Sequence, residues 1–408
     1  MREARSPAAR GLWPLQLLNF FMADVQAGIG PFLGVFLQAH GWRSGPIGSV
    51  MTIGGVAGVA MTTPAGALID ASSRKRTLIA AACLCSVLDS AIILWSQRFT
   101  LVGLSQVATA IAGAALGPAV NGVTLGLVRQ SGFDRQNGRN QAFNHAGNVV
   151  GAGLAGYLGW RFGLVAVFWL AALFGVLAIV SAMMIPKDAI DDRVARGLGE
   201  RAGEIPGFRV LVDCKPLLVL AAALAFFHLG NAAMLPLYGL AIVAQDHADP
   251  AQFVATTIVV AQLVMIGASL AAMRVAERQG YWVLLLVSFL ALPARGAIAA
   301  LLHARWGVYP VQMLDGIGAG LQSVAVPGLV VRLLNGAGRV NVGLGAVMTA
   351  QGVGAALSPA LGGWIAQEIG YASAFGILGS FALGSVALWL RFAPQVRPAC
   401  AAPLASFP

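Results

Sequence analysis

The protein has 408 residues, of which 58% are hydrophobic and only 10% are charged, with a mean hydropathy of +0.78. A soluble domain carries about a quarter of its residues as Asp, Glu, Lys and Arg, so this composition excludes a water-soluble globular protein and indicates a membrane protein. The net charge of +10 does not predict a nucleic-acid partner, because the basic residues occupy short gaps between long apolar runs.

Sequence motifs for enzyme chemistry are absent. The four cysteines, Cys83, Cys85, Cys214 and Cys400, have neither a disulfide nor a metal-ligand spacing, so we expect four inert thiols. The sequence contains no phosphate-binding Gly-Lys-Ser/Thr loop and no nucleophile beside a partner base. It therefore predicts a protein that is not an enzyme, is not driven by ATP hydrolysis, and holds no cofactor and no metal.

Apolar runs give the predicted spans, since a transmembrane helix needs about 20 mostly apolar residues. The first run, from about 12 to 38, is longer than the roughly 7–15 apolar residues of a signal sequence, so it predicts a retained first helix. In chain order the predicted spans are 12–39, 45–70, 77–96, 101–128, 142–163, 164–185, 216–244, 252–273, 281–302, 306–334, 342–367 and 372–393. A turn at Trp160, Arg161 and Gly163 has to separate the fifth span from the sixth.

Basic residues gather on one side of these spans. With a cytoplasmic N-terminus, 21 of the 26 lysines and arginines fall in cytoplasmic segments, 4 fall on the opposite side, and Arg295 lies within a span. This bias is typical of cytoplasmic loops and supports an even number of spans. We therefore expect a multi-pass protein of a bacterial-type inner (plasma) membrane with both termini in the cytoplasm.

A charged segment divides the spans six and six. It predicts an N-terminal six-helix bundle over 1–185, a cytoplasmic linker over 186–215, a C-terminal six-helix bundle over 216–393 and a cytoplasmic tail over 394–408. The halves match at offsets of 204 to 207, pairing Phe20-Phe21 with Phe226-Phe227, Asp70 with Glu277, Gln106 with Gln312, and Gly159-Trp160 with Gly363-Trp364. We expect parallel repeats about an axis along the membrane normal, with the pathway between them.

The loop after the second span carries a family resemblance. Residues 66–76 read GALIDASSRKR and resemble the signature loop of the major facilitator superfamily, in which Gly is followed four residues later by Asp and then by a basic cluster. Ala71 and Ser73 replace the usual Arg and Gly, and the counterpart at 273–280 lacks the leading Gly. The resemblance implies a transporter and an all-α membrane protein, with twelve transmembrane helices in two pseudo-symmetric six-helix bundles.

The same loop predicts a conformational latch. Gly66 lets neighbouring helices approach closely, and Asp70 can pair with a cation or cap a helix start. The other latch residues are Arg74 and Lys75, with Glu277 and Arg278 in the counterpart. Breaking the latch would shift the balance between outward-open and inward-open states. The alternative is a topological anchor made only of positive charge.

Polar and ionisable residues within the spans are the first candidates for transport, because they are costly to bury in hydrocarbon. The resemblance implies that the first, fourth, seventh and tenth helices line a central cavity. The proton-coupling and substrate candidates on these helices are Asp24, Gln26, Thr109, Asn121, His228, Asn231, Gln312 and Asp315.

Asp24 is the leading candidate for proton coupling. It lies near the middle of a span that contains Gly28, Gly30 and Pro31, and such a broken helix can expose carbonyls to a cavity. The alternative is a carboxylate locked to a neighbouring helix. Asp315 either binds a cation or substrate or braces helices. It aligns with Thr109, where many antiporters of the superfamily carry an Arg.

Three further residues are predicted to give intramembrane polar support: Asp89, His145 and Arg295. Asp89 and Arg295 occupy equivalent places in the third and ninth spans, which the resemblance places at the periphery, so we expect local pairing or snorkelling. Direct substrate contact is the alternative, and an anionic substrate would favour it for Arg295. The histidines at 145 and 228 brace helices or titrate near neutral pH.

Gly354, Pro359 and Gly363 predict close helix packing and a hinge in the eleventh span. With Gly345 and Ser358 they resemble the antiporter motif of the superfamily, although that motif belongs in the fifth span, where the equivalent stretch lacks its Pro. Export is favoured only by this incomplete motif.

Together these features predict a monomeric secondary active transporter in the lipid bilayer that moves a small organic solute by alternating access, coupled to protons, with export slightly favoured. One alternative is proton-coupled uptake of an organic anion or metal chelate, for which Arg295 and the histidines supply positive charge. An alternative of another class is a non-transporting membrane sensor or scaffold.

Overall fold

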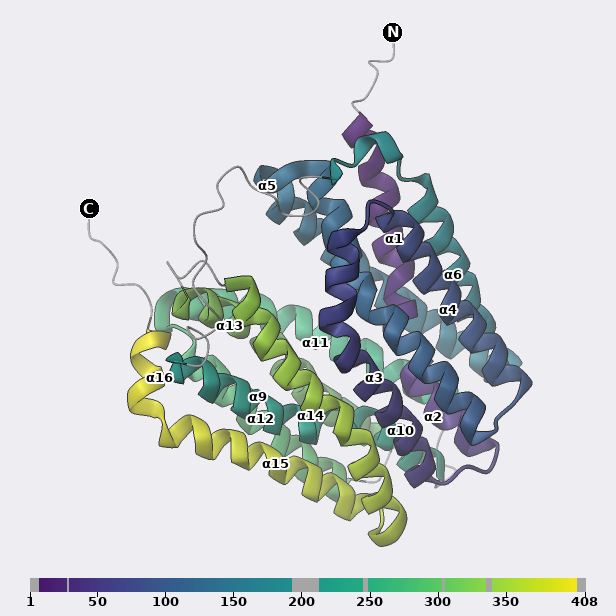
Figure 1. Ribbon diagram of the computed structural model, residues 1–408. Coiled ribbons are helices and arrows are strands. Elements are labelled where there is room, and N and C mark those ends of the chain that lie inside the picture. Colours follow the sequence, from purple (N-terminus) through teal and green to yellow (C-terminus); the bar gives the residue numbers. More distant parts are fainter. Residues whose placement is uncertain are drawn as a thin grey trace. The chain divides into compact units, whose positions relative to one another are not determined.

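The computed structural model describes residues 7–27, 29–192, 213–244, 249–302, 305–334 and 340–401. All regular elements in these ranges are helices (Figure 1). A helix satisfies its backbone hydrogen bonds internally, which an apolar membrane interior demands. The predicted all-α class is confirmed.

The N-terminal half contains α1 (Pro7–Ala27), α2 (Ile29–Ala39), α3 (Ser44–Ala71), α4 (Lys75–Trp95), α5 (Phe99–Phe162), α6 (Val165–Met184) and the 3-10 helix η1 (Lys187–Ala189). The C-terminal half contains α9 (Lys215–Asn231), α10 (Met234–Ala244), α11 (Pro250–Gln279), α12 (Trp282–Leu301), the 3-10 helix η2 (Arg305–Gly307), α13 (Val308–Leu333), α14 (Val340–Ile369), α15 (Tyr371–Arg391) and α16 (Ala393–Cys400). Most of the predicted linker, from 193 to 212, lies outside the described residues.

Ten helices of the described part are long and apolar enough to cross a bilayer. Two predicted spans are missing from this set. The span 12–39 covers α1 and α2 on either side of residue 28, which lies outside the described residues, and the span 142–163 forms the last part of α5. Length and composition alone therefore do not confirm the count of twelve.

Helix α5 combines two predicted spans and the loop expected between them. Its backbone leaves helical geometry at Arg129, which has φ 57° and ψ −179°, and helical residues continue on both sides. Of the turn predicted at Trp160, Arg161 and Gly163, only Gly163 lies between the helices, because α5 continues to Phe162 and α6 begins at Val165. Gly163 has a φ of 83°, a backbone conformation that favours glycine.

The chain forms two compact units. The first contains Met1–Gly41, Ile53–Ala202 and Asp249–Thr256, and the second contains Trp42–Thr52, Gly203–Ala248 and Thr257–Pro408. In the first unit, α1 and α4 each pack on α5 and α6; in the second, α9 packs on α14 and α15, and α12 packs on α13 and α15. The pattern of neighbours is therefore similar in the two units, as expected of a repeated bundle.

Helical periodicity explains the core of the first unit. Leu15, Leu18 and Met22 are spaced three and four residues apart, so they lie on one face of α1. This face is buried in a cluster with Ile79 and Cys83 of α4 and with apolar residues of α5 and α6.

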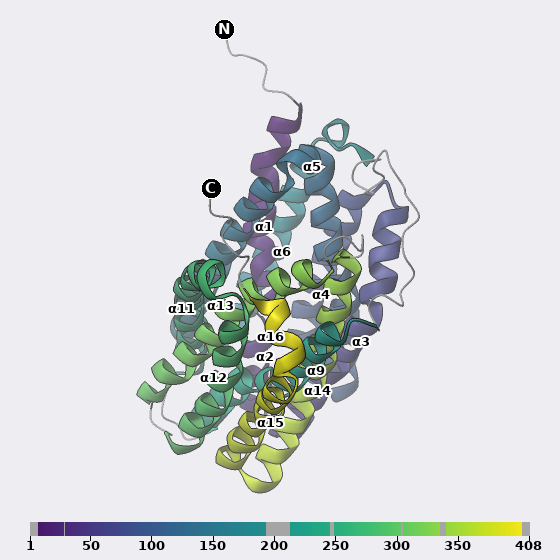
Figure 2. The ribbon, with the colours of Figure 1, turned by 90° about the vertical axis from the view of Figure 1, so that its left-hand side faces the viewer.

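The C-terminal segment predicted as a tail begins with a docked helix. Figure 2 shows α16, in yellow, folded back on the second unit, where it contacts α9, α12, α13 and α15. The carbonyl oxygen of Cys400 accepts hydrogen bonds from Tyr281 N at 3.0 Å and from Arg332 Nη1 at 3.1 Å. Residues 393–400 are thus part of the folded unit.

Candidate transport site

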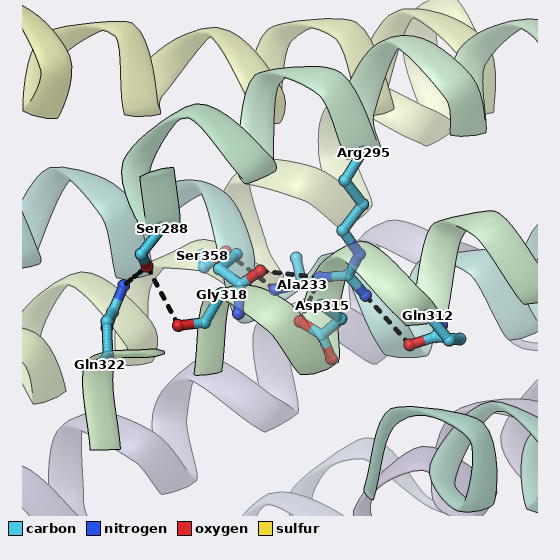
Figure 3. Close-up of polar contacts among 9 residues, drawn as sticks. Ala233, Ser288, Arg295, Gln312, Asp315, Gly318, Gln322 and Ser358 are labelled. Atoms are coloured by element: carbon cyan, nitrogen blue, oxygen red, sulfur yellow. Dashed lines mark hydrogen bonds and ion pairs between the residues drawn. The ribbon is translucent and has the colours of Figure 1, made fainter. Parts of the chain in front are cut away.

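Arg295 is the centre of a polar network inside the second unit. Its side chain is 1% exposed, and a buried charge is costly unless it is paired and hydrogen-bonded. Nη1 donates to Asp315 Oδ1 at 2.7 Å and to Asn231 Oδ1 at 2.7 Å, and Nη2 donates to Gln312 Oε1 at 3.4 Å. Figure 3 shows the guanidinium pointing at Asp315 and Gln312. Three helices, α9, α12 and α13, therefore meet at one cation.

Helix α13 carries two partners of Arg295 on one face, because Gln312 and Asp315 are three residues apart. The glycines of this stretch allow close packing on the other side: a Cβ at Gly316 would lie 2.5 Å from the carbonyl oxygen of Ala261 in α11. The side chain of Asp315 is 17% exposed, compared with 1% for Arg295. The carboxylate is therefore the more accessible member of the ion pair.

Two donors of the network lack partners among the described residues: Arg295 Nε and Gln312 Nε2 are both buried and unpaired. Leaving a buried donor unsatisfied costs about 1–3 kcal/mol. A hydroxyl, a carboxylate or a water molecule at this point would relieve that cost. The network can therefore accept an additional hydrogen-bond acceptor.

Further polar residues extend the network along the same helices. Gln322 Nε2 donates to Ser288 Oγ at 2.9 Å, and Ser288 Oγ donates to the carbonyl oxygen of Gly318 at 3.0 Å (Figure 3). Sequence reasoning did not single out Ser288 or Gln322. A spacing of seven could have found them, since Ser288 precedes Arg295, and Gln322 follows Asp315, by two helical turns.

His228 connects α9 with α14. Its Nε2 lies 2.9 Å from Nε2 of Gln351, so the amide donates when the ring nitrogen accepts. Gln351 is a third residue, after Ser288 and Gln322, that sequence reasoning missed.

A break between α9 and α10 positions Asn231, the last residue of α9. Ser358 of α14 accepts a hydrogen bond from the backbone N–H of Ala233 through its Oγ at 2.9 Å. Side-chain hydroxyls commonly satisfy the backbone groups that a broken membrane helix frees. The break thus places Asn231 beside Arg295.

The predicted packing residues of α14 lie at close approaches. A Cβ at Gly354 would lie 2.2 Å from the carbonyl oxygen of Ala225, and a Cβ at Gly363 would lie 2.4 Å from that of Ser44. Pro359 lies inside α14 without ending it. Glycine at positions 354 and 363 therefore lets the backbone of α14 approach those of Ala225 and Ser44 closely.

The first unit contains a pair of residues at the positions equivalent to Arg295 and Gln312. Gln106 Nε2 donates to Asp89 Oδ1 at 3.2 Å and to Oδ2 at 3.4 Å. Asp89 and Arg295 are 206 residues apart, as are Gln106 and Gln312. The two repeats therefore join the same helix positions, with an anion in one and a cation in the other.

The other cavity candidates are more dispersed. Thr109 Oγ1 donates to the Ser105 carbonyl oxygen at 2.9 Å, Asn121 is exposed, and His145 is half-buried in α5. Asp24 and Gln26 lie in α1, but their side chains are outside the described part of the structure.

The predicted latch is described only in part. The surroundings of Gly66 and the side chains of Asp70 and Glu277 lie outside the described part of the structure, whereas Arg74 and Arg278 are exposed. Lys75 is 2% exposed, and its Nζ donates to the carbonyl oxygen of Ser72 at 2.8 Å.

The sequence profile described as Major Facilitator Superfamily matches residues 12–341. The chain belongs to the major facilitator superfamily. Two uncharacterized MFS-type transporters of Mycobacterium tuberculosis, from strains CDC 1551 / Oshkosh and ATCC 25618 / H37Rv, are each 39% identical to this superfamily member over 387 residues. These residues make up 93% of this chain and 92% of each relative.

Solved structures agree on the fold. A mutant of the nucleoside transporter NupG has a TM-score of 0.78 at 12% identity, covering 94% of this chain and 99% of NupG. The peptide transporter POT in complex with sulfate also has a TM-score of 0.78 at 12% identity, covering 96% of both chains. This superfamily member is therefore a multi-pass membrane transporter of the MFS type.

Proposed function

We propose that this superfamily member is a secondary active transporter that moves a small organic solute by alternating access and is coupled to protons, with export favoured by the incomplete motif of α14. The observation that carries the proposal is the Arg295–Asp315 pair, in which a partly exposed carboxylate neutralises a buried guanidinium at 2.7 Å. The relatives and the family are transporters, which also points away from an enzyme.

Protonation of Asp315 provides the coupling step. The pair holds α12 against α13, and the neutral acceptors Asn231 and Gln312 hold the guanidinium when the carboxylate loses its charge. The loss of one ionic contact then changes the relative stability of two helix arrangements, which is a population shift. Arg295 cannot serve as the proton carrier, because a guanidinium stays charged in proteins.

Gradient-driven flux tests this role. Purified protein in vesicles with an internal pH-sensitive dye is screened against charged and neutral organic solutes for solute-dependent proton movement. For a solute that causes such proton movement, we expect Asp315→Asn to abolish accumulation driven by a pH gradient, while solute exchange without a gradient continues. Asp89→Asn is the matched control, because Asp89 contacts an amide rather than a cation. Unchanged gradient-driven accumulation in Asp315→Asn would overturn the proposal.

Asp24 stays a prediction for proton coupling and is tested in the same assay as Asp24→Asn.

The direction of transport follows from solute accumulation in cells with and without the protein: lower accumulation in cells that contain it supports export.

Proton-coupled uptake of an organic anion or metal chelate is the second candidate. The unpaired donors Arg295 Nε and Gln312 Nε2 favour an anionic substrate, since an anionic group offers acceptors to buried donors. Higher accumulation of anionic solutes in cells that contain the protein would support uptake over export. Flux of no solute in either assay would favour the sensor or scaffold.

A further inference from the structure

The buried guanidinium of Arg295 depends on a single negative charge. Its side chain is 1% exposed, and Asp315, at 2.7 Å, is the one carboxylate paired with it among the described residues. Asn231 and Gln312 also accept hydrogen bonds from the guanidinium, but their amides carry no charge. Protonation of Asp315 therefore leaves an uncompensated cation inside the second unit, which is strongly unfavourable.

Two side chains of this network hold donors that no described group uses. Arg295 Nε and Gln312 Nε2 are buried and have no hydrogen-bond partner among the described residues. Gln312 is 0% exposed, and the two side chains are bonded to each other through Arg295 Nη2 and Gln312 Oε1 (Figure 3). Buried polar groups are normally paired, so the network has room for acceptors that the described chain does not supply.

The ion pair is open on the side of its carboxylate, since Asp315 is 17% exposed whereas Arg295 is enclosed. A ligand can therefore reach the pair at Asp315. A water molecule or a neutral hydroxyl there would accept hydrogen bonds but would not replace a lost negative charge. Only an anion does both.

We infer that Arg295 exchanges counterions: when Asp315 takes up a proton, the guanidinium binds a monoanionic carboxylate group of the transported solute in place of the Asp315 carboxylate. Oδ1 of Asp315 is the oxygen bonded to Arg295, which leaves Oδ2 to take the proton from solution. One proton and one anion then bind together without a change in net charge, and both leave when Asp315 pairs with Arg295 again. A carboxylate suits this place, because its two oxygens match the fixed donors of a guanidinium. The exchange rests on the proposed function, in which Asp315 is the protonated group, and adds the class of the solute.

A second titratable group faces Asp315. From α12 and α9, the ionisable side chains that act on it are Arg295 and His228. Residues 250–273 of α11 and 340–367 of α14 contain no ionisable side chain. Protonation of His228 is thus the competing way to add positive charge at low pH, and the test has to separate the two groups.

Acetate and acetamide are the probes, because they have nearly the same shape and differ in charge. Thermal unfolding of the purified full chain in detergent is followed against probe concentration at pH 6, 7 and 8, and the stabilisation gives an apparent Kd. We expect acetate but not acetamide to stabilise the wild type, with an affinity that falls by up to about tenfold per pH unit, the limit for one linked proton. Asp315→Asn resembles the protonated carboxyl at every pH, so acetate should bind it equally well at all three.

The controls remove either the cation or an unrelated carboxylate. Acetate should stabilise neither Arg295→Gln nor Arg295→Gln/Asp315→Asn, and the double variant keeps the test decisive should a single variant fail to fold, because it buries no charge. Asp89→Asn, in the first unit, should behave like the wild type.

Equal effects of acetate and acetamide, no acetate effect, a wild-type affinity that does not change with pH, or acetate binding by the double variant would overturn the inference. So would a pH dependence that disappears in His228→Gln and persists in Asp315→Asn, because the proton would then belong to His228. Proton-linked acetate binding without gradient-driven solute flux would support the exchange and count against the proposed coupled transport, whereas flux without acetate binding would do the reverse.

Discussion

Neutralising Asp315 tests how much the stability of the protein depends on pairing the buried charge of Arg295. The two side chains are 2.7 Å apart, which corresponds to a gross attraction of about 6 kcal/mol at an effective dielectric constant of about 20. Desolvation of the guanidinium offsets much of this attraction. Removing one partner of a buried pair nevertheless costs about 3–5 kcal/mol, because the remaining charge is uncompensated.

We expect Asp315→Asn to lower the free energy of unfolding by about 3 kcal/mol, the lower end of that range. The new amide oxygen, Asn231 and Gln312 still offer acceptors to the guanidinium. In Arg295→Gln/Asp315→Asn no charge is buried, so the double change should cost about 1–3 kcal/mol less than the sum of the single changes.

Equilibrium chemical denaturation of the purified chain in detergent at pH 7 measures all four corners of this cycle. Asp89→Asn serves as a control that removes a buried carboxylate without leaving a cation behind, since its described side-chain partners, Gln106 and Ser105, are neutral. Additivity of the two single changes within about 0.5 kcal/mol would refute the coupling between Arg295 and Asp315. A loss of stability in Asp89→Asn as large as in Asp315→Asn would refute the role of the uncompensated charge.

Three other changes test local features. Gly354→Ala is expected to destabilise the protein by about 1–3 kcal/mol, because the new Cβ would lie 2.2 Å from a carbonyl oxygen of α9. Gly345→Ala is the control: a Cβ there would have no atom within 4 Å, so its thermal unfolding should be nearly unchanged. Arg129→Gly should raise the stability of the protein by roughly 1 kcal/mol, because a backbone with φ 57° and ψ −179° is strained for an arginine. The ion pair that the change removes, with Asp191, is exposed and 3.8 Å long. Lower stability of the variant in thermal unfolding would mean that this ion pair outweighs the strain. Burial raises the pKa of Cys400 from 9.0 to about 12, so maleimide at pH 8 should modify this thiol only after denaturation. The stability from keeping that thiol neutral is complete below pH 9 and is lost as the pH rises toward 12, which a denaturation series over pH 8–11 measures; modification of the native thiol at pH 8 would contradict its burial.

Much of the fold could be predicted because membrane insertion depends on local chain properties. The predicted span 281–302 nearly coincides with α12 (Trp282–Leu301), and 372–393 with α15 (Tyr371–Arg391). The prediction was less accurate where a span is interrupted or a loop stays helical. Hydropathy reports the length of an apolar run, but the break after α9 and the kink at Arg129 depend on which neighbouring groups satisfy the backbone.

The candidate site could be predicted only as a set of separate residues. The cost of polar groups in hydrocarbon made Asn231, Gln312 and Asp315 candidates, and the resemblance to the superfamily placed them on cavity helices. Arg295 was expected to pair locally at the periphery. Their meeting point depends on the rotation of three helices about their axes, which no single stretch of sequence specifies.

The sequence by itself determined the membrane class, the bias of basic charge to one side and the resemblance to the superfamily, because each depends on residue type and spacing along one segment. Only the tertiary structure decided that Arg295 pairs with Asp315, 20 residues away, and with Asn231, 64 residues away. It also placed Lys187 across a cavity from the start of α4. Both results depend on packing between segments that are distant in sequence, and packing is set by the shape of the whole unit.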